Sequence, residues 1–150
     1  MTKRILIFLF LAFVSLSLSA QKHYSAKMIK ADNKIMVPAD IEGYKIKNFI
    51  FDTGSTTTVL LEEDLVQLKR RGIVSEKNRK PDCYLRGYEE KKILVKSYVV
   101  PSLTIGNMRI RNVEIIFNSV SHFRLLGQNV MKLFDKVTIN YKANTIDFEK

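Results

Sequence analysis

One run of this 150-residue chain, residues 49–60, constrains its fold and its chemistry more than any other segment. It reads Phe-Ile-Phe-Asp-Thr-Gly-Ser-Thr-Thr-Thr-Val-Leu, an apolar strand that ends on Asp52 and leads into small hydroxyl residues. A carboxylate that activates water needs a rigid support and nearby hydrogen-bond donors, and Gly54 would let a substrate approach the backbone closely. Taken alone, Asp-Thr-Gly is more often an ordinary turn. The apolar residues before Asp52 favour a buried strand instead, so an acid at its end needs a reason to be there.

The N-terminus has the pattern of a secretory signal peptide over residues 1–20. Lys3 and Arg4 precede an apolar run over residues 5–14, and small residues follow up to Ala20. The run is shorter than the roughly 20 apolar residues that span a bilayer, which disfavours a transmembrane anchor. We therefore expect cleavage after Ala20 and export to the periplasm or the exterior, with no stable membrane span in the mature protein.

The remaining part, residues 21–150, is predicted to form a single domain with a modest core. Cys83 is the only cysteine, so no internal disulfide can form. The two histidines, His23 and His122, show no partner pattern for nucleophilic catalysis, and together with one cysteine they provide no metal-ligand spacing. We expect a protein that uses neither a metal nor another cofactor.

The formal net charge of +10 raises the question of an anionic partner. Lysine and arginine are spread singly among aspartate and glutamate, without the interleaved aromatic residues that are typical of nucleic-acid binding. We therefore expect no nucleic acid as a partner. A solvated surface, or attraction to anionic components of the cell envelope, fits the pattern better.

The rest of the mature chain indicates short strands joined by turns. The expected strands are residues 34–41, 44–51, 93–100, 102–105, 108–117, 136–141 and 145–148. Gly106-Asn107 reads as a tight hairpin turn, and residues 61–72, with acids first and bases last, favour one short helix. Many short strands with little helix predict an all-β fold, a small closed barrel or a sandwich.

A second motif lies at residues 124–134, where an apolar pair is followed by Gly127, two polar residues and an amphipathic helical turn. An apolar segment must cover the rear of the strand that carries Asp52, and a glycine would permit the close approach. Alone, this motif would indicate only an ordinary strand-to-helix corner.

Together, the two motifs resemble the retropepsin-like (retroviral-type) family of aspartic proteases, over roughly residues 35–148. The resemblance implies a small closed β barrel of that family's type with one or two short helices. It implies that Asp52 is the catalytic residue, that Thr53 bonds across a dimer and that Ser55 donates a hydrogen bond to a carboxylate oxygen. The implied active-site loop is Thr53, Gly54 and Ser55, and the implied supports behind it are Leu126, Gly127 and Asn129. The closing hairpin resembles that of bacterial envelope members.

The family also implies a flap, a hairpin that closes over the substrate. The candidate lies within residues 84–92, and its candidate residues are Tyr84, Arg86, Gly87 and Tyr88. Viral flaps are richer in glycine, and an exposed turn is an equal alternative for this segment.

The implied function is that of an exported aspartic endopeptidase acting on peptide or protein substrates. Because the Asp-Thr-Gly motif occurs once, the resemblance implies a homodimer in which the two Asp52 carboxylates share a proton. The charged carboxylate would take a proton from water while the protonated one polarises the scissile carbonyl. The alternative is a non-catalytic dimeric module of the same fold that binds peptide or an envelope polymer.

Overall fold

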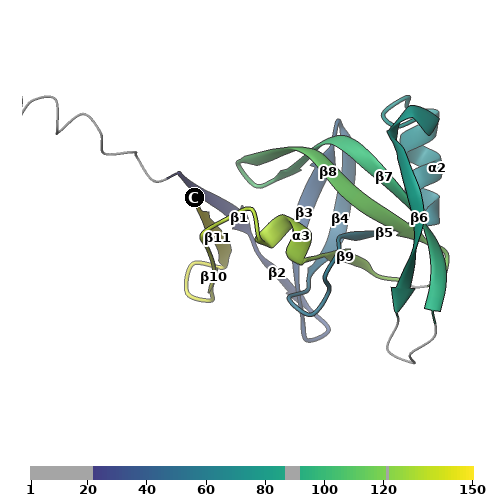
Figure 1. Cartoon of the computed structure of the whole chain (residues 1–150). Coiled ribbons are helices and arrows are strands. Elements are labelled where there is room, and N and C mark those ends of the chain that lie inside the picture. Colours follow the sequence, from purple (N-terminus) through teal and green to yellow (C-terminus); the bar gives the residue numbers. More distant parts are fainter. Residues whose placement is uncertain (1–21, 87–91, 121) are drawn as a thin grey trace, which may run out of the picture.

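The computed structural model describes residues 22–86, 92–120 and 122–150, and this part of the chain is mostly β-strand (Figure 1). The predicted signal peptide lies outside the described residues. The strands are β1 (His23–Lys27), β2 (Ile29–Ala31), β3 (Lys34–Ile41), β4 (Tyr44–Phe51), β5 (Val59–Leu61), β6 (Arg79–Arg86), β7 (Lys92–Ile105), β8 (Met108–Asn118), β9 (Arg124–Leu126), β10 (Lys136–Asn140) and β11 (Thr145–Glu149). The helical elements are α2 (Glu62–Arg70), α3 (Gln128–Met131) and the 3₁₀ turn η2 (Glu76–Asn78).

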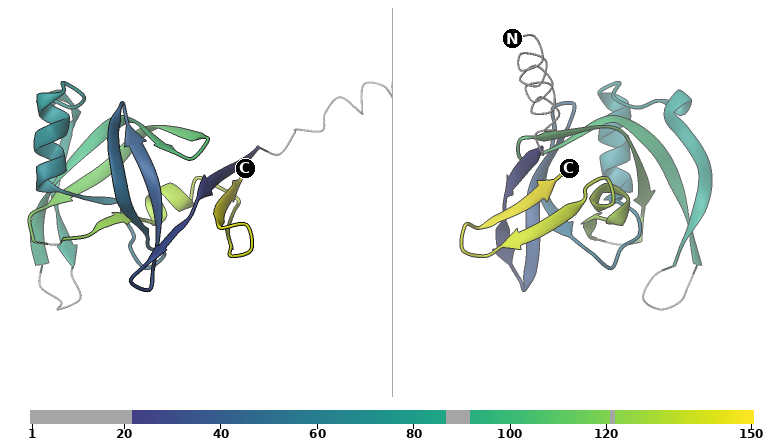
Figure 2. Two further views of the ribbon diagram at one scale, coloured as in Figure 1. Left: turned by 180° about the vertical axis from the view of Figure 1, so that it is seen from behind. Right: turned by 60° about the vertical axis from the view of Figure 1, so that its left-hand side comes forward.

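The larger sheet closes on itself. Its strand order is β2-β3-β4-β9-β5-β8-β7-β6. β3 also pairs with β7 in an antiparallel manner, so the strands from β3 to β7 in this order form a closed ring. A smaller sheet, β1-β11-β10, lies beside this ring and brings both ends of the described chain together (Figures 1 and 2). The predicted all-β fold with a small closed barrel is confirmed.

Most of the expected strands form where the sequence pattern places them. β3 and β4 have the predicted bounds, and the turn between them, Glu42-Gly43, has positive φ at both residues (47° and 89°), as a tight hairpin turn requires. The turn at Gly106 also has positive φ, and it joins β7 to β8 as expected. The closing hairpin of β10 and β11 is present as well.

The expected break between residues 100 and 102 is wrong, because β7 runs without interruption through Pro101. On one side of β7, β6 pairs only as far as Tyr98, and β3 begins to pair at Thr104. Pro101 therefore lies in the gap between these two partners. A proline, which has no N–H to donate, is tolerated in a strand at such a position.

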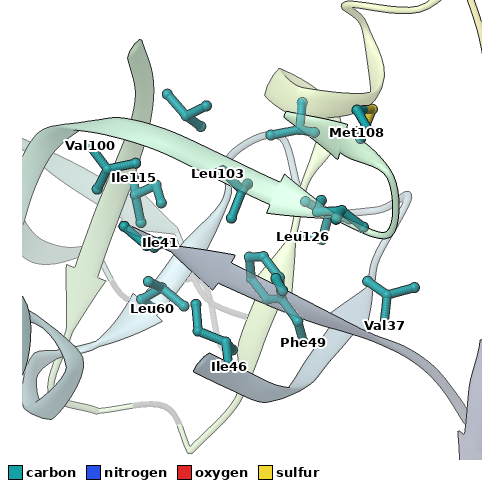
Figure 3. Packing of buried hydrophobic residues seen from close by; sticks show 14 of the residues in the cluster. Val37, Ile41, Ile46, Phe49, Leu60, Val100, Leu103, Met108, Ile115 and Leu126 are labelled. Carbon is teal, nitrogen blue, oxygen red and sulfur yellow. The ribbon is translucent and has the colours of Figure 1, made fainter. Parts of the chain in front are cut away.

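The core fills the inside of the ring (Figure 3). Phe49 of β4, Leu60 of β5 and Leu126 of β9 are fully buried and pack in one cluster with Leu103 and Ile115 from β7 and β8. Each such side chain stabilises the fold by roughly 1.5–3 kcal/mol relative to an exposed position. The three strands that surround Asp52 are thus each anchored by a buried side chain.

Candidate active site

Asp52 directly follows β4 and begins the loop that leads to β5. Although β4 and β5 are consecutive in the chain, β9 lies between them, parallel to β4 and antiparallel to β5. The backbone N–H of Asp52 donates to the carbonyl of Leu126 at 3.1 Å, which extends the β4–β9 ladder by one bond. The base of the loop is therefore held by a strand that comes from much later in the sequence.

Gly127 lies where the loop and the β9–α3 corner approach most closely. A Cβ atom at this position would lie 2.2 Å from the carbonyl oxygen of Thr57 and 2.9 Å from the nitrogen of Thr58. Both of these are backbone atoms, so a side chain would force one segment away from the other. The structure thus places Leu126 and Gly127 directly behind the loop, where the sequence motif suggests a close approach.

Backbone N–H groups at the start of α3 hold the far half of the loop. Gln128 N–H donates to the carbonyl of Ser55 at 2.8 Å, and Asn129 N–H donates to the carbonyl of Thr56 at 3.1 Å. The Asn129 side chain accepts a hydrogen bond from the hydroxyl of Thr58 at 2.7 Å. Loop and helix therefore form one hydrogen-bonded unit, and Asn129 belongs to it.

The carboxylate of Asp52 is half-buried and only lightly partnered. Within the described residues, its one hydrogen bond comes from the N–H of Gly54, which donates to Oδ1 at 2.9 Å. A Cβ on Gly54 would lie 3.2 Å from the same oxygen, so a side chain there would crowd the carboxylate. The described residues therefore leave most of the acceptor capacity of Asp52 unused.

The expected role of Ser55 is wrong in this chain. Its hydroxyl donates to the carbonyl of Thr57 at 2.7 Å and not to a carboxylate oxygen. The hydroxyl can donate only one hydrogen bond, and the carbonyl of Thr57, two residues further along the same turn, takes it. The hydrogen bond that the loop gives to the carboxylate comes from the backbone N–H of Gly54. Ser55 stiffens the loop by bonding to it.

Gln128 is a loop contact that the sequence reasoning missed. Its side-chain amide donates from Nε2 to the carbonyl of Thr53 at 2.7 Å. Thr53 itself is exposed. A polar residue after the glycine was visible in the sequence, but only the folded chain shows which loop carbonyl it reaches.

The flap candidates lie partly in the described structure. Tyr84 and Arg86 belong to β6 and pair with Leu94 and Lys92 of β7, so the two strands form a hairpin. Gly87 and Tyr88 lie outside the described residues. The inward side of this hairpin packs on a small apolar cluster that includes Val59 of β5 and Leu125 of β9; its members from the hairpin are Cys83, Leu85, Ile93 and Val95. The hairpin therefore rests on the strands that flank Asp52.

A second buried carboxylate was missed by the sequence reasoning. Asp64 is fully buried and accepts hydrogen bonds from the hydroxyl of Tyr44 at 2.6 Å and from the guanidinium of Arg124 at 2.8 and 3.0 Å. The N–H of Leu61 donates to it at 2.9 Å. Burial and the hydrogen bond to Asp64 raise the pKa of Tyr44 to about 12, and the same carboxylate raises the pKa of Arg124. This network joins α2 to the starts of β4 and β9.

Two other kinds of site, a nucleophilic cysteine and a metal centre, can be checked in the part of the chain that the structure describes. Cys83 borders a cavity of about 480 Å³ that Thr57 and Asn129 also line. Burial raises the pKa of the Cys83 thiol, helped by Glu114 and Asp82. A thiol with a raised pKa is a poor nucleophile at neutral pH. The described residues contain no group of three histidine, cysteine or acidic side chains that could hold a metal ion. Nor do they include a helix with the length and apolar character needed to cross a bilayer.

An apolar barrel with an Asp-Thr-Gly loop, supported from behind by a Gly-containing corner, defines the class of the aspartic proteases. The family model described as "Aspartyl protease" matches residues 37–130, more than half of the chain. The chain belongs to this family. No curated protein sequence matches it.

Among solved structures, the fold is similar to the crystal structure of a retropepsin-like aspartic protease from Rickettsia conorii. The TM-score is 0.58 and the sequence identity is 20%, and the match covers 86% of this chain and 91% of the other. At this identity the likeness concerns the fold, which is retropepsin-like.

Proposed function

We propose that this protein is an exported aspartic endopeptidase whose active site is built by two copies of the chain. The observation that carries the proposal is the environment of Asp52. This residue is half-buried on a loop held by hydrogen bonds, and its carboxylate accepts one backbone hydrogen bond within the described chain. A carboxylate held in orientation but with free acceptor capacity can bind and activate a water molecule.

The second copy is required by the chemistry. The chain carries one Asp-Thr-Gly motif, whereas the proposed mechanism uses a charged and a protonated carboxylate together. Two Asp52 side chains that meet on a twofold axis would share one proton, because two carboxylates a few ångström apart do not both ionise readily. Thr53, which is exposed, is available to bond with the partner's loop.

The central experiment compares Asp52→Asn with the wild type in a peptide-library cleavage assay across acidic and neutral pH. Asparagine keeps the size of the side chain but cannot take a proton from water, so cleavage should fall by at least about 10²–10⁴-fold. Asp32→Asn, at the exposed β2–β3 turn, is the matched control and should leave cleavage unchanged. A wild type that cleaves no peptide, with Asp52→Asn identical in peptide binding, would establish the non-catalytic binding module instead.

Dilution tests the shared site. Specific activity should fall steeply as the dimer dissociates, and sedimentation of the mature protein should show the same concentration dependence. Constant specific activity from micromolar to sub-nanomolar protein, with a monomeric mass, would contradict a two-chain site.

Export is tested separately by N-terminal sequencing of the protein recovered from the cell envelope. The sequence should begin at Gln21 or a neighbouring residue. An intact Met1 on protein found in the cytosol would contradict export and leave the proposed chemistry untouched.

A further inference from the structure

One peptide group of the active-site loop, between Thr53 and Gly54, is held at both ends. Its carbonyl accepts a hydrogen bond from Nε2 of Gln128 at 2.7 Å, and its N–H donates to Oδ1 of Asp52 at 2.9 Å. Because the peptide group is planar, its C=O and N–H directions cannot turn independently. A side chain that fixes the carbonyl therefore also fixes the direction in which the N–H points.

We propose that Gln128 is a positioning residue for Asp52, acting through the Thr53–Gly54 peptide group. The three groups form a chain of hydrogen bonds from the Gln128 amide, across the peptide group, to the carboxylate. Hydrogen bonds in such a chain polarise one another, so the Gln128 donor strengthens the bond that Gly54 makes to Asp52. The amide thus both aims the Gly54 N–H and makes it a better donor to the Asp52 carboxylate.

The backbone on which Gln128 lies is itself held against the loop. Gln128 is half-buried, its own N–H donates to the carbonyl of Ser55 at 2.8 Å, and the preceding Gly127 packs against the backbone of Thr57 and Thr58. The amide therefore starts from a backbone that cannot move away from the loop. The neighbouring Asn129 makes its hydrogen bonds elsewhere. They are to Thr56 and Thr58 in the far half of the loop and to Glu114 of β8.

The test uses Gln128→Met, which keeps the length of the side chain and removes the donor. In nuclear magnetic resonance spectra of the mature protein, the Gly54 amide proton should shift upfield and exchange faster with solvent. The catalytic constant kcat should fall about 3- to 10-fold, as for the loss of one hydrogen bond, while KM stays unchanged. Gln128→Lys, which restores a donor of similar reach, should recover most of both effects.

The matched control is Gln67→Met on α2, the same chemical change at a half-buried glutamine that lies outside the active-site loop and its supports. It should move neither the Gly54 resonance nor kcat. If Gln128→Met does not fold, Gln128→Asn carries the same measurements, because its amide is too short to reach the Thr53 carbonyl.

The kinetic part of this proposal rests on the proposed function, but the spectroscopic part does not. An unchanged Gly54 resonance in Gln128→Met, or an equal change in Gln67→Met, would overturn the role of Gln128. A shifted Gly54 resonance in Gln128→Met, found together with a wild type that cleaves no peptide, would uphold the positioning role and refute the protease.

Discussion

Two aspartates, Asp52 before β5 and Asp64 after it, differ in burial and in the number of hydrogen bonds that they accept. Asp64 is fully buried and accepts hydrogen bonds from Tyr44, Arg124 and the N–H of Leu61, which together use the acceptor sites of both its oxygens. Asp52 is half-buried and accepts one hydrogen bond within the described residues, from Gly54. The difference lies in how much acceptor capacity the fold leaves unused.

That difference separates a carboxylate whose acceptor sites are filled from one whose acceptor sites are open. A buried carboxylate is costly unless it is paired and hydrogen-bonded, and Arg124 with Tyr44 meets this need for Asp64. The same partners leave Asp64 no room to bind water or substrate. Asp52 accepts fewer hydrogen bonds from the described residues, and under the proposed function its open acceptor sites would bind the reacting water.

The largest expected effect comes from Asp64→Asn. The substitution removes the charge that balances the half-buried Arg124 and leaves only the exposed Glu63 as its ionic partner. We expect the free energy of unfolding to fall by about 3–5 kcal/mol, measured by urea denaturation. Asp52→Asn is the matched variant and should change stability by no more than about 0.5 kcal/mol. Equal losses in the two variants would remove the distinction between the two carboxylates.

Gly127→Ala should have the next largest effect, because its Cβ would meet the backbone of Thr57. We expect a loss of about 1–3 kcal/mol in thermal or urea unfolding, together with reduced cleavage as the loop that carries Asp52 is displaced. Gly43→Ala is the control, since its φ is +89° but the space around it is open. It should cost only about 1 kcal/mol and leave cleavage unchanged. If Gly43→Ala reduced cleavage as much as Gly127→Ala, the loop contact would not be the cause.

Tyr44→Phe should have the smallest effect, and it tests how much the hydrogen bond from Tyr44 stabilises the buried Asp64. It removes one hydrogen bond to the buried carboxylate and should cost about 1 kcal/mol at neutral pH. Because the pKa of Tyr44 is raised to about 12 from 10.0, its contribution is complete below pH 10 and is lost as the pH rises through about 12. The stability difference between wild type and variant should therefore shrink over this range in urea titrations. A difference that grows with pH would contradict the donor role of Tyr44.

The sequence predicts the local features of this fold well. The bounds of β3 and β4, the turn at Gly106 and the closing hairpin follow from alternation and turn residues within a few positions. Pro101 shows the limit of such reasoning, because a proline interrupts a strand or not depending on neighbours that come from elsewhere in the chain.

The candidate site also contains features that the sequence predicts and features that it does not. Asp52 and the corner at Gly127 can be recognised from residue types and from the need for close approach. Residue types do not predict the hydrogen bonds of the Ser55 hydroxyl, the Gln128 amide or the Asp64 carboxylate. Each of these bonds depends on which carbonyl or side chain lies within about 3 Å in the folded chain. Sequence patterns specify the backbone elements, whereas hydrogen-bond partners are set by their packing.

The position of β9 between β4 and β5 also has a consequence for how the chain folds. Gln128 and Thr53, whose hydrogen bond supports the loop, are 75 positions apart in the sequence. Contacts of such high contact order form late, because the entropy of closing a long segment is lost before the contact can stabilise anything. During synthesis, the hydrogen bonds that β9 and α3 give to the Asp52 loop cannot form until these elements have left the ribosome. The loop that carries the carboxylate thus gains its full set of supports only when nearly all of residues 22–150 have been made.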